Sequence, residues 1–430
     1  MYEVELLARF VVTLLGVAFP VILQIISRLD DKYKSVSIVA LFDREFIKKA
    51  FIILLAISLI SIFIWSFKFK PFNEFSNCCL VNNSAAIFVV ITIILLIVCF
   101  FRLVAKIFIY SIPIKLANYL KEKISKQLKN NLHNNNNEDY VKALSDVLNF
   151  SIREGNYELL REIKTIINNV FIDYQTENGQ YPNSFYFLVY NAVEELTLKQ
   201  RNPKLLSLVD EAMAGWLLGV KIDKNISEQT FIWIWNCINL VLESDKDYMI
   251  ERYWEYAHRF FDFKIGESEL EKRFLEFQFA LGGILIFNGK VNLIEHMFSY
   301  TNIEPPNYYL LPKDKPAIFS SYNEIMNLND DSFTTRYPYS SSIVSTLQFP
   351  KINKSFITKY FSLLYLRQTA LDTNQSYIFS DELKANLSRK RGYFFTQEEI
   401  NNMFITNDNN TFIIDTLTEF EWRIRWKLYL

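Results

Sequence analysis

A run of 17 residues without a single charge, AAIFVVITIILLIVCFF, extends from Ala85 to Phe101. About 17–25 apolar residues are enough for a helix to cross the hydrocarbon core of a bilayer, so this run is long enough. Two uncharged runs of similar length precede it, at Phe10–Ser27 and Ala50–Phe67. The sequence therefore predicts an integral membrane protein whose residues 1–112 form a transmembrane domain of three helices, at about 6–27, 50–67 and 85–111.

Lys and Arg gather in two segments near these runs, Arg28–Lys49 and Arg102–Lys129. The leading segment Met1–Ala8 contains neither residue, and the loop Lys68–Ser84 contains only two. Because basic loops remain in the cytoplasm, we expect a multi-pass protein with its amino terminus outside and its carboxy-terminal domain in the cytosol. The abundance of Asn, Ile, Lys and Phe indicates a bacterial source, and hence the inner (cytoplasmic) membrane. A cleaved signal peptide, the alternative for the first run, would need a basic amino end, whereas this one is acidic.

Charge divides the chain into two parts of opposite sign. Through Asn137 there are 16 Lys and Arg against 8 Asp and Glu, and the remainder has 30 against 39. Basic residues beside a membrane are attracted to anionic lipid, so the lipid bilayer is the partner that this part predicts. The acidic remainder argues against general nucleic-acid binding.

One proline and three polar residues within the predicted spans have two possible roles. Pro20 permits a kink in the first span beside Gln24, and Ser58 and Ser61 share one side of the second. These residues either line a pore or pack against a neighbouring helix. Packing is the favoured interpretation, because isolated serines are common in spans and no charged residue lies within the apolar cores.

The sequence predicts an all-α protein in which the transmembrane helices are followed by a cytosolic helical domain. Residues 113–137 form a basic stalk that ends in an Asn-rich linker, which we expect to be flexible. Residues 138–300 form a solenoid-like helical-repeat domain, in which helix pairs recur at spacings of 45, 44 and 41 residues. An irregular helical bundle is the alternative architecture. The pairs are predicted to start near Asp139, Ser184, Glu228 and Glu269, with inner turns at Gly155-Asn156, Asn202-Pro203, Ser244-Asp245 and Asn288-Gly289.

The repeated units resemble tetratricopeptide or HEAT-type repeats in their length and in their small polar inner turns, most clearly at Gly155-Asn156-Tyr157-Glu158-Leu159-Leu160. The resemblance covers about residues 139–300 and implies a stacked solenoid with a long concave surface. The Trp, Gly and Pro positions that are diagnostic of tetratricopeptide repeats are not matched in this chain. The resemblance therefore does not imply that the chain binds peptides as that family does.

Residues 301–430 are predicted to form a carboxy-terminal helical region that begins with a long irregular connection. Prolines and a serine cluster mark that connection, and helices are expected again at about Ser355–Leu371 and Asp381–Lys390. Two basic clusters in this region are candidates for binding a phosphate-bearing ligand, although solvent-exposed helix ends are the simpler interpretation. Their residues are Arg389, Lys390, Arg391, Arg423 and Arg425.

No motif in the chain points to catalysis. There is no phosphate-binding glycine loop, dinucleotide fingerprint, paired-His zinc helix or nucleophile elbow, and each of the three histidines stands alone. The pair Gly282-Gly283 lies in an apolar helical run, where close helix packing explains it better than phosphate binding. We therefore expect a protein that is not an enzyme, with no catalytic residues, no cofactor and no metal.

The layout as a whole resembles membrane effectors of bacterial antiphage defence, in which a few amino-terminal spans carry a helical ligand-sensing domain. This resemblance implies an effector that forms a pore or channel or disrupts the membrane, under control of a cytosolic domain that receives a nucleotide or oligonucleotide signal. Three spans are too few to enclose an aqueous path, so such an effector would be a homo-oligomer. The alternative is a membrane-anchored scaffold whose helical repeats bind a cytosolic protein partner.

Overall fold

The computed structural model describes residues 9, 11, 13, 16, 19–66, 84–129, 136–174, 180–199, 216, 226–244, 246–263, 268–300, 311–312, 314–338 and 349–372. Over these residues the protein forms 15 α-helices and a short π-helix, and no strand, which confirms the all-α class. The chain divides into two compact units. The first comprises Met1–Asp173 with Asn183–Leu188, and the second comprises Tyr174–Pro182 with Val189–Leu430.

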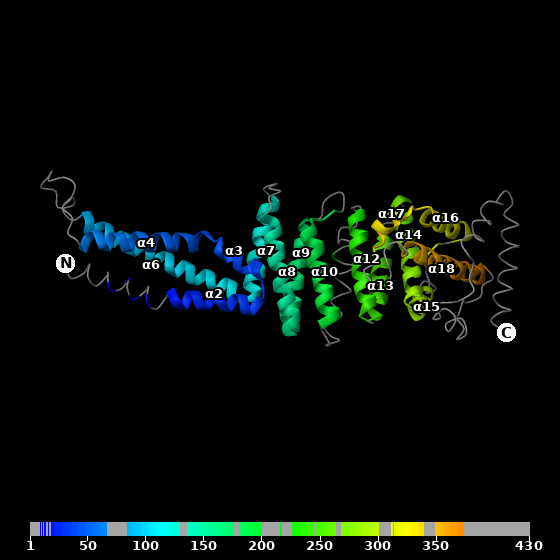
Figure 1. Ribbon diagram of the computed structural model, residues 1–430, viewed down its shortest axis with the longest axis horizontal. Coiled ribbons are helices and arrows are strands. Elements are labelled where there is room, and N and C mark those ends of the chain that lie inside the picture. Colours follow the sequence, from blue (N-terminus) through cyan, green and yellow to red (C-terminus); the bar gives the residue numbers. More distant parts are fainter. Residues whose placement is uncertain are drawn as a thin grey trace. The chain divides into compact units, whose positions relative to one another are not determined.

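Among its described residues, the first unit contains two candidate membrane-spanning helices, which pack against each other along their length (Figure 1). They are α4 (Phe46–Ser66) and α6 (Ser84–Ser111), and their apolar windows are Phe46–Trp65 and Ala86–Ser111. Only 22% of the first window and 33% of the second are buried, whereas a core helix of a soluble protein would be mostly covered. Large apolar side chains such as Ile60, Phe63 and Phe101 are more than half exposed.

The first predicted span, at about 6–27, lies largely outside the described residues and stays a prediction. Its described end belongs to α2 (Phe19–Tyr33), which is followed by the short α3 (Val36–Asp43). The hydroxyl of Ser35 caps α3 by accepting a hydrogen bond from the backbone N–H of Ile38, at 3.1 Å.

Three further helices belong to the first unit. These are α7 (Pro113–Lys129), α8 (Asn136–Glu154) and α9 (Tyr157–Tyr174). The prediction assigned them to a stalk and to the repeat domain, but they belong to the same compact unit as the candidate spans. The reason is packing: the apolar stripe of α7, which includes Leu116 and Leu120, is fully buried, and α8 packs on α2, α3 and α7.

The helix α10 (Asn183–Glu194) belongs partly to each unit, and the π-helix η2 (Glu195–Lys199) follows it. In the described part of the second unit, seven further α-helices come after η2. α14 contacts α15, α16 and α18, α12 contacts α13 and α17, and α13 contacts α15. The helices are α12 (Glu228–Glu243), α13 (Tyr248–Phe263), α14 (Ser268–Phe287), α15 (Val291–Tyr300), α16 (Lys315–Met326), α17 (Asp330–Arg336) and α18 (Phe349–Asp372).

The predicted helix starts agree with the structure, as do the predicted turns at Gly155, Ser244 and Gly289. Helices begin at Asn136, Asn183, Glu228 and Ser268, each within three residues of a predicted start. Two turn glycines, Gly155 and Gly289, have φ angles of +66° and +71°, a region that only glycine enters without strain. The predicted turn at Asn202-Pro203 lies outside the described residues.

The irregular connection predicted after Tyr300 is wrong in part, because α16 and α17 both lie within it. Two of the prolines that suggested a loop, Pro316 and Pro338, lie at helix boundaries instead. Pro316 is in the first turn of α16, where a missing N–H costs nothing, and Pro338 follows α17. Both helices have side-chain caps: Asp314 accepts from the N–H of Ala317 at 2.8 Å, and Asn329 accepts from that of Ser332 at 2.7 Å.

Helix packing at Gly282 confirms the structural interpretation of the Gly282-Gly283 pair. A Cβ atom on Gly282 would overlap the ring of Tyr360 on α18, which is itself fully buried. The absence of a side chain therefore allows α14 and α18 to approach each other closely.

Candidate functional site

The candidate functional site lies in the first unit, where the candidate spans meet α3, α7 and α8. Its central residue is Glu45, which occupies the turn between α3 and α4. The backbone N–H of Arg44 ends α3 by donating to the carbonyl of Ala40, and the carbonyl of Glu45 accepts from the N–H of Lys48 in the first turn of α4. Glu45 is thus fixed at the point where the first candidate span begins.

Three side chains from α6 and α7 converge on the Glu45 carboxylate. The hydroxyls of Tyr110 and Tyr119 donate to its Oε1 at 2.8 and 2.6 Å, and the ammonium of Lys106 lies 3.2 Å from the same oxygen. The side chains of Lys106 and Glu45 are each only 16% exposed. A partly buried carboxylate needs such partners, because an unpaired charge in this position would be costly.

Two ammonium groups lie over one aromatic ring at this site. Nζ of Lys106 is 3.5 Å from the centroid of the Tyr119 ring, and Nζ of Lys123 is 5.4 Å from it. The ring face carries partial negative charge and attracts both cations. Among the residues that the structure describes, Lys123 has no carboxylate within ion-pair distance, so this ring is its main electrostatic partner.

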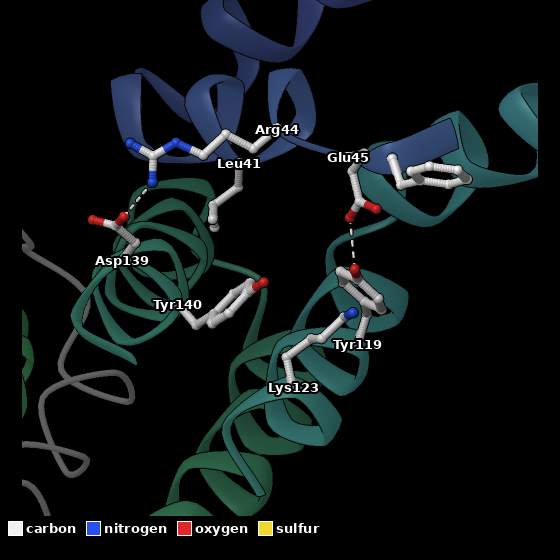
Figure 2. A pocket seen from close by; sticks show the side chains of 8 residues that line it. Leu41, Arg44, Glu45, Tyr119, Lys123, Asp139 and Tyr140 are labelled. Carbon is white, nitrogen blue, oxygen red and sulfur yellow. Dashed lines mark hydrogen bonds and ion pairs between the residues drawn. The ribbon is translucent and has the colours of Figure 1, made fainter. Parts of the chain in front are cut away.

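A cavity of about 280 Å³ opens beside this cluster (Figure 2). On its opposite side, Arg44 forms an ion pair with Asp139 of α8, with Nη1 and Oδ2 2.5 Å apart. Figure 2 shows Tyr140 between that ion pair and the Glu45–Tyr119 hydrogen bond, with Lys123 near the Tyr119 ring. The complete lining is Leu41, Arg44, Glu45, Phe46, Tyr119, Lys123, Asp139 and Tyr140.

Both tyrosines of the lining remain protonated at neutral pH. Burial raises the pKa of Tyr119 well above its usual value, and the hydrogen bond to Glu45 and the negative charge of Glu45 add to the increase. Burial is also the main reason why the pKa of Tyr140 is raised, followed by the charges of Glu45 and Asp139. The site therefore contains two neutral phenol groups, of which Tyr119 already donates to Glu45, beside three cations and two carboxylates.

Further hydrogen bonds join the carboxy-terminal ends of α2 and α6 to each other and to α8. Lys32 and Tyr33, at the end of α2, donate to the last carbonyls of α6, at 2.7 Å to Ser111 and 3.0 Å to Tyr110. Such groups satisfy carbonyls that a helix end leaves without partners. The guanidinium of Arg153 on α8 donates to the carbonyl of Tyr33 at 2.8 Å. The ends of α2 and α6 are thereby held to α8.

A second polar cluster, in the second unit, is structural. Arg273 on α14 contacts Glu228 through two hydrogen bonds of 2.8 and 2.7 Å and also donates to the hydroxyl of Tyr337 at 2.7 Å. Glu276 accepts from that hydroxyl at 2.6 Å and pairs with Arg336 at 2.7 Å. Two carboxylates balance two guanidinium groups, so the cluster holds α17 against α12 and α14 without a surplus charge for a ligand.

The predicted span residues lie in two different environments. Ser58 and Ser61 are buried on the side of α4 that faces α6, where the hydroxyl of Ser61 lies 3.3 Å from that of Thr92. Pro20 and Gln24 are exposed on α2. In the single chain the serines thus contact a neighbouring helix, and their role in a pore stays a prediction, as does that of Pro20 and Gln24.

The basic residues predicted to bind a ligand, Arg389, Lys390, Arg391, Arg423 and Arg425, lie outside the described residues. Their role stays a prediction. The described part of the chain contains no group of three or more His, Cys, Asp or Glu side chains placed to hold a metal ion.

The Glu45 cluster was not predicted from sequence. Its one visible signal is a carboxylate shortly before the apolar run Ala50–Phe67, in a segment with more basic than acidic residues. Tyr119 and Asp139 are 74 and 94 residues further along the chain, which hides the cluster from any local pattern. Comparison of the chain with family models, curated proteins and solved structures finds no match.

Proposed function

We propose that this protein is an oligomeric effector of the bacterial inner membrane. In this proposal α4, α6 and the first apolar run cross the bilayer, the amino terminus is outside, and the carboxy-terminal domain is in the cytosol. Several copies assemble around an axis and open a pore or disrupt the membrane, because three spans in one chain cannot enclose an aqueous path. The proposed context is defence against phage.

The observation that carries this proposal is the connection made by Glu45. Glu45 precedes α4, Lys106 and Tyr110 belong to the end of α6, and Tyr119 belongs to α7. A passive anchor requires only a covalent link to its cargo. Buried polar contacts between both candidate spans and the next helix favour a protein in which movement of that helix changes the arrangement of the spans.

The packing of the second unit supports the proposed solenoid. The first helices of two successive pairs contact each other, since the rings of Phe231 on α12 and Phe274 on α14 are 4.8 Å apart. The second helices of the same pairs, α13 and α15, also contact each other. Contacts between equivalent helices are typical of stacked two-helix repeats. We propose that this domain receives the signal, with the basic residues at 389–391, 423 and 425 binding a nucleotide or oligonucleotide.

The effector is distinguished from a membrane-anchored scaffold by its effect on the membrane potential. Overexpression of the full chain in bacterial cells should collapse the potential reported by a voltage-sensitive dye. A scaffold should leave the potential unchanged and should still bind its protein partner when its spans are replaced by an unrelated three-helix anchor. Detergent-purified particles should be rings with the spans around the axis, and a monomer would contradict the proposal.

Tyr119→Phe tests the connection itself, because it removes only the hydroxyl that donates to Glu45 at 2.6 Å. A hydrogen bond to a charged group contributes about 1.5–3 kcal/mol, so we expect depolarisation to decrease at least about tenfold while membrane insertion is retained. Tyr140→Phe is the matched control, since Tyr140 lines the same cavity but its hydroxyl forms no hydrogen bond to the described residues. Equal depolarisation by both variants would contradict a role for the Tyr119–Glu45 hydrogen bond in the proposed mechanism.

A further inference from the structure

We infer that the cavity between α3, α4, α7 and α8 binds the phosphate group of an anionic phospholipid. The first argument is charge. Arg44 and Lys123 line the cavity together with the carboxylates of Glu45 and Asp139, and Lys106 beside it pairs with Glu45. Because Arg44 pairs with Asp139, Lys123 is the cation of this group that lacks a carboxylate partner within the part of the chain that the structure describes, and a phosphate diester would supply the missing negative charge.

The second argument is the arrangement of donors. Lys106 already pairs with Glu45, and Arg44 pairs with Asp139 through a single nitrogen. Lys123 has no carboxylate partner among the described residues, and its ammonium lies over the same ring as that of Lys106. An anion near Lys123 would reduce the repulsion between the two ammonium groups, and the guanidinium of Arg44 has further N–H groups for phosphate oxygens.

The third argument is size and position. A volume of about 280 Å³ far exceeds the ~30 Å³ of one water and accommodates a tetrahedral phosphate with its ester substituent. Phe46 lines the cavity, begins the candidate span Phe46–Trp65 and is 80% exposed. If α4 crosses the bilayer, the hydrocarbon begins at this residue, so a phospholipid beside α4 places its phosphate at the level of the cavity.

The test measures lipid binding to the full chain in detergent by native mass spectrometry. Phosphatidylglycerol should bind more tightly than phosphatidylcholine. Lys123→Gln should weaken phosphatidylglycerol binding about fivefold, which corresponds to ~1 kcal/mol for one Lys near anionic lipid. Lys126→Gln is the matched control, because Lys126 is exposed on the same helix and does not line the cavity. Equal losses in the two variants, or no loss in either, would overturn the inference.

A second variant gives a result of opposite sign. Asp139→Asn releases Arg44 from its carboxylate partner, so phosphatidylglycerol should bind two- to fivefold more tightly, whereas damage to the fold would weaken binding. Weaker binding by this variant in a folded sample contradicts the inference. Binding of millimolar inorganic phosphate without binding of phosphatidylglycerol would overturn the lipid as the source of the phosphate group. Binding is measured without reference to depolarisation, so this inference and the proposed effector function can fail separately.

Discussion

Gly282 is the position on α14 where the α18 ring of Tyr360 leaves no room for a side chain. The ring is fully buried and cannot move aside without displacing its neighbours, which include the ring of Phe279 at 5.8 Å. Gly282→Ala should therefore lower the free energy of unfolding by about 1–3 kcal/mol. Chemical denaturation of the detergent-solubilised chain, followed by tryptophan fluorescence, measures the change.

The control for this clash is the same substitution in a Tyr360→Ala background. Without the ring, the added methyl group meets no obstacle, and Ala favours helix over Gly by about 1 kcal/mol. Gly282→Ala should then be neutral or stabilising. A penalty that is equally large in both backgrounds would show that the ring is not its cause.

At the scale of residues, the sequence identified side chains whose neighbours are close in the chain and missed those whose neighbours are distant. The burial of Gly282 in a helix contact was predictable from the apolar run around it. Glu45 has no such local context, because its three partners come from α6 and α7. A carboxylate in a basic segment is an ordinary surface residue until the fold brings Tyr110 and Tyr119 to it.

At the scale of elements, α16 depends on its amino-terminal cap. The carboxylate of Asp314 accepts from the N–H of Ala317 at 2.8 Å and lies at the positive end of the helix dipole. Asp314→Ala should cost about 1 kcal/mol of unfolding free energy, measured by chemical denaturation. Asp314→Ser retains a capping oxygen and should recover most of the loss. Identical stability of the Ala and Ser variants would contradict this role for the cap.

The polar cluster that holds α17 should make stability depend on pH. Burial would raise the pKa of Glu228, but the hydrogen bond from Arg273 and the charges of Arg273 and Arg336 outweigh it and lower the pKa below its usual value. A carboxyl group with a lowered pKa in the folded state stabilises the fold above its ordinary pKa of about 4.5, and this contribution is lost as the pH falls below that value.

Thermal unfolding at pH 7 and pH 4 measures this contribution. Glu228→Gln should reduce the difference between the two unfolding midpoints, because the variant has no carboxylate to protonate at this position. Glu269→Gln is the control on α14, since the side chain of Glu269 is 89% exposed. An unchanged pH dependence in Glu228→Gln would show that the acid sensitivity comes from other groups.

Some helix boundaries could be predicted from the sequence and others could not, because some boundary residues indicate one structure and others are compatible with two. Gly155 and Gly289 end helices in a conformation that suits glycine, so their turns were visible locally. Proline is ambiguous, because it both breaks a helix interior and begins a helix well. Pro316 does the latter in α16. The assignment of α7 and α8 to the unit of the spans was also hidden, since an amphipathic stripe does not reveal which surface covers it.

At the scale of the whole molecule, the proposed orientation rests on where Lys and Arg occur, and thiol labelling tests it. The loop Lys68–Ser84 contains Cys78 and Cys79 and is predicted to be outside. The other two cysteines are buried, and burial raises the pKa of the Cys237 thiol to about 12, so that it forms little reactive thiolate at neutral pH. A membrane-impermeant maleimide added to intact cells should therefore label the wild-type chain at Cys78 and Cys79 only.

Moving the reactive thiol to α7 should reverse this result. In a chain that carries Cys78→Ser and Cys79→Ser, Lys126→Cys places a thiol on an exposed position of α7, which follows the second candidate span and is predicted to be cytosolic. This chain should be labelled only after the membrane is permeabilised, and the double-serine chain alone should remain unlabelled in both conditions. If the thiol at position 126 reacts in intact cells, the cytosolic helices are on the wrong side of the membrane for an intracellular signal to reach them. The proposed control of the spans through Glu45 and Tyr119 would then have no signal to transmit.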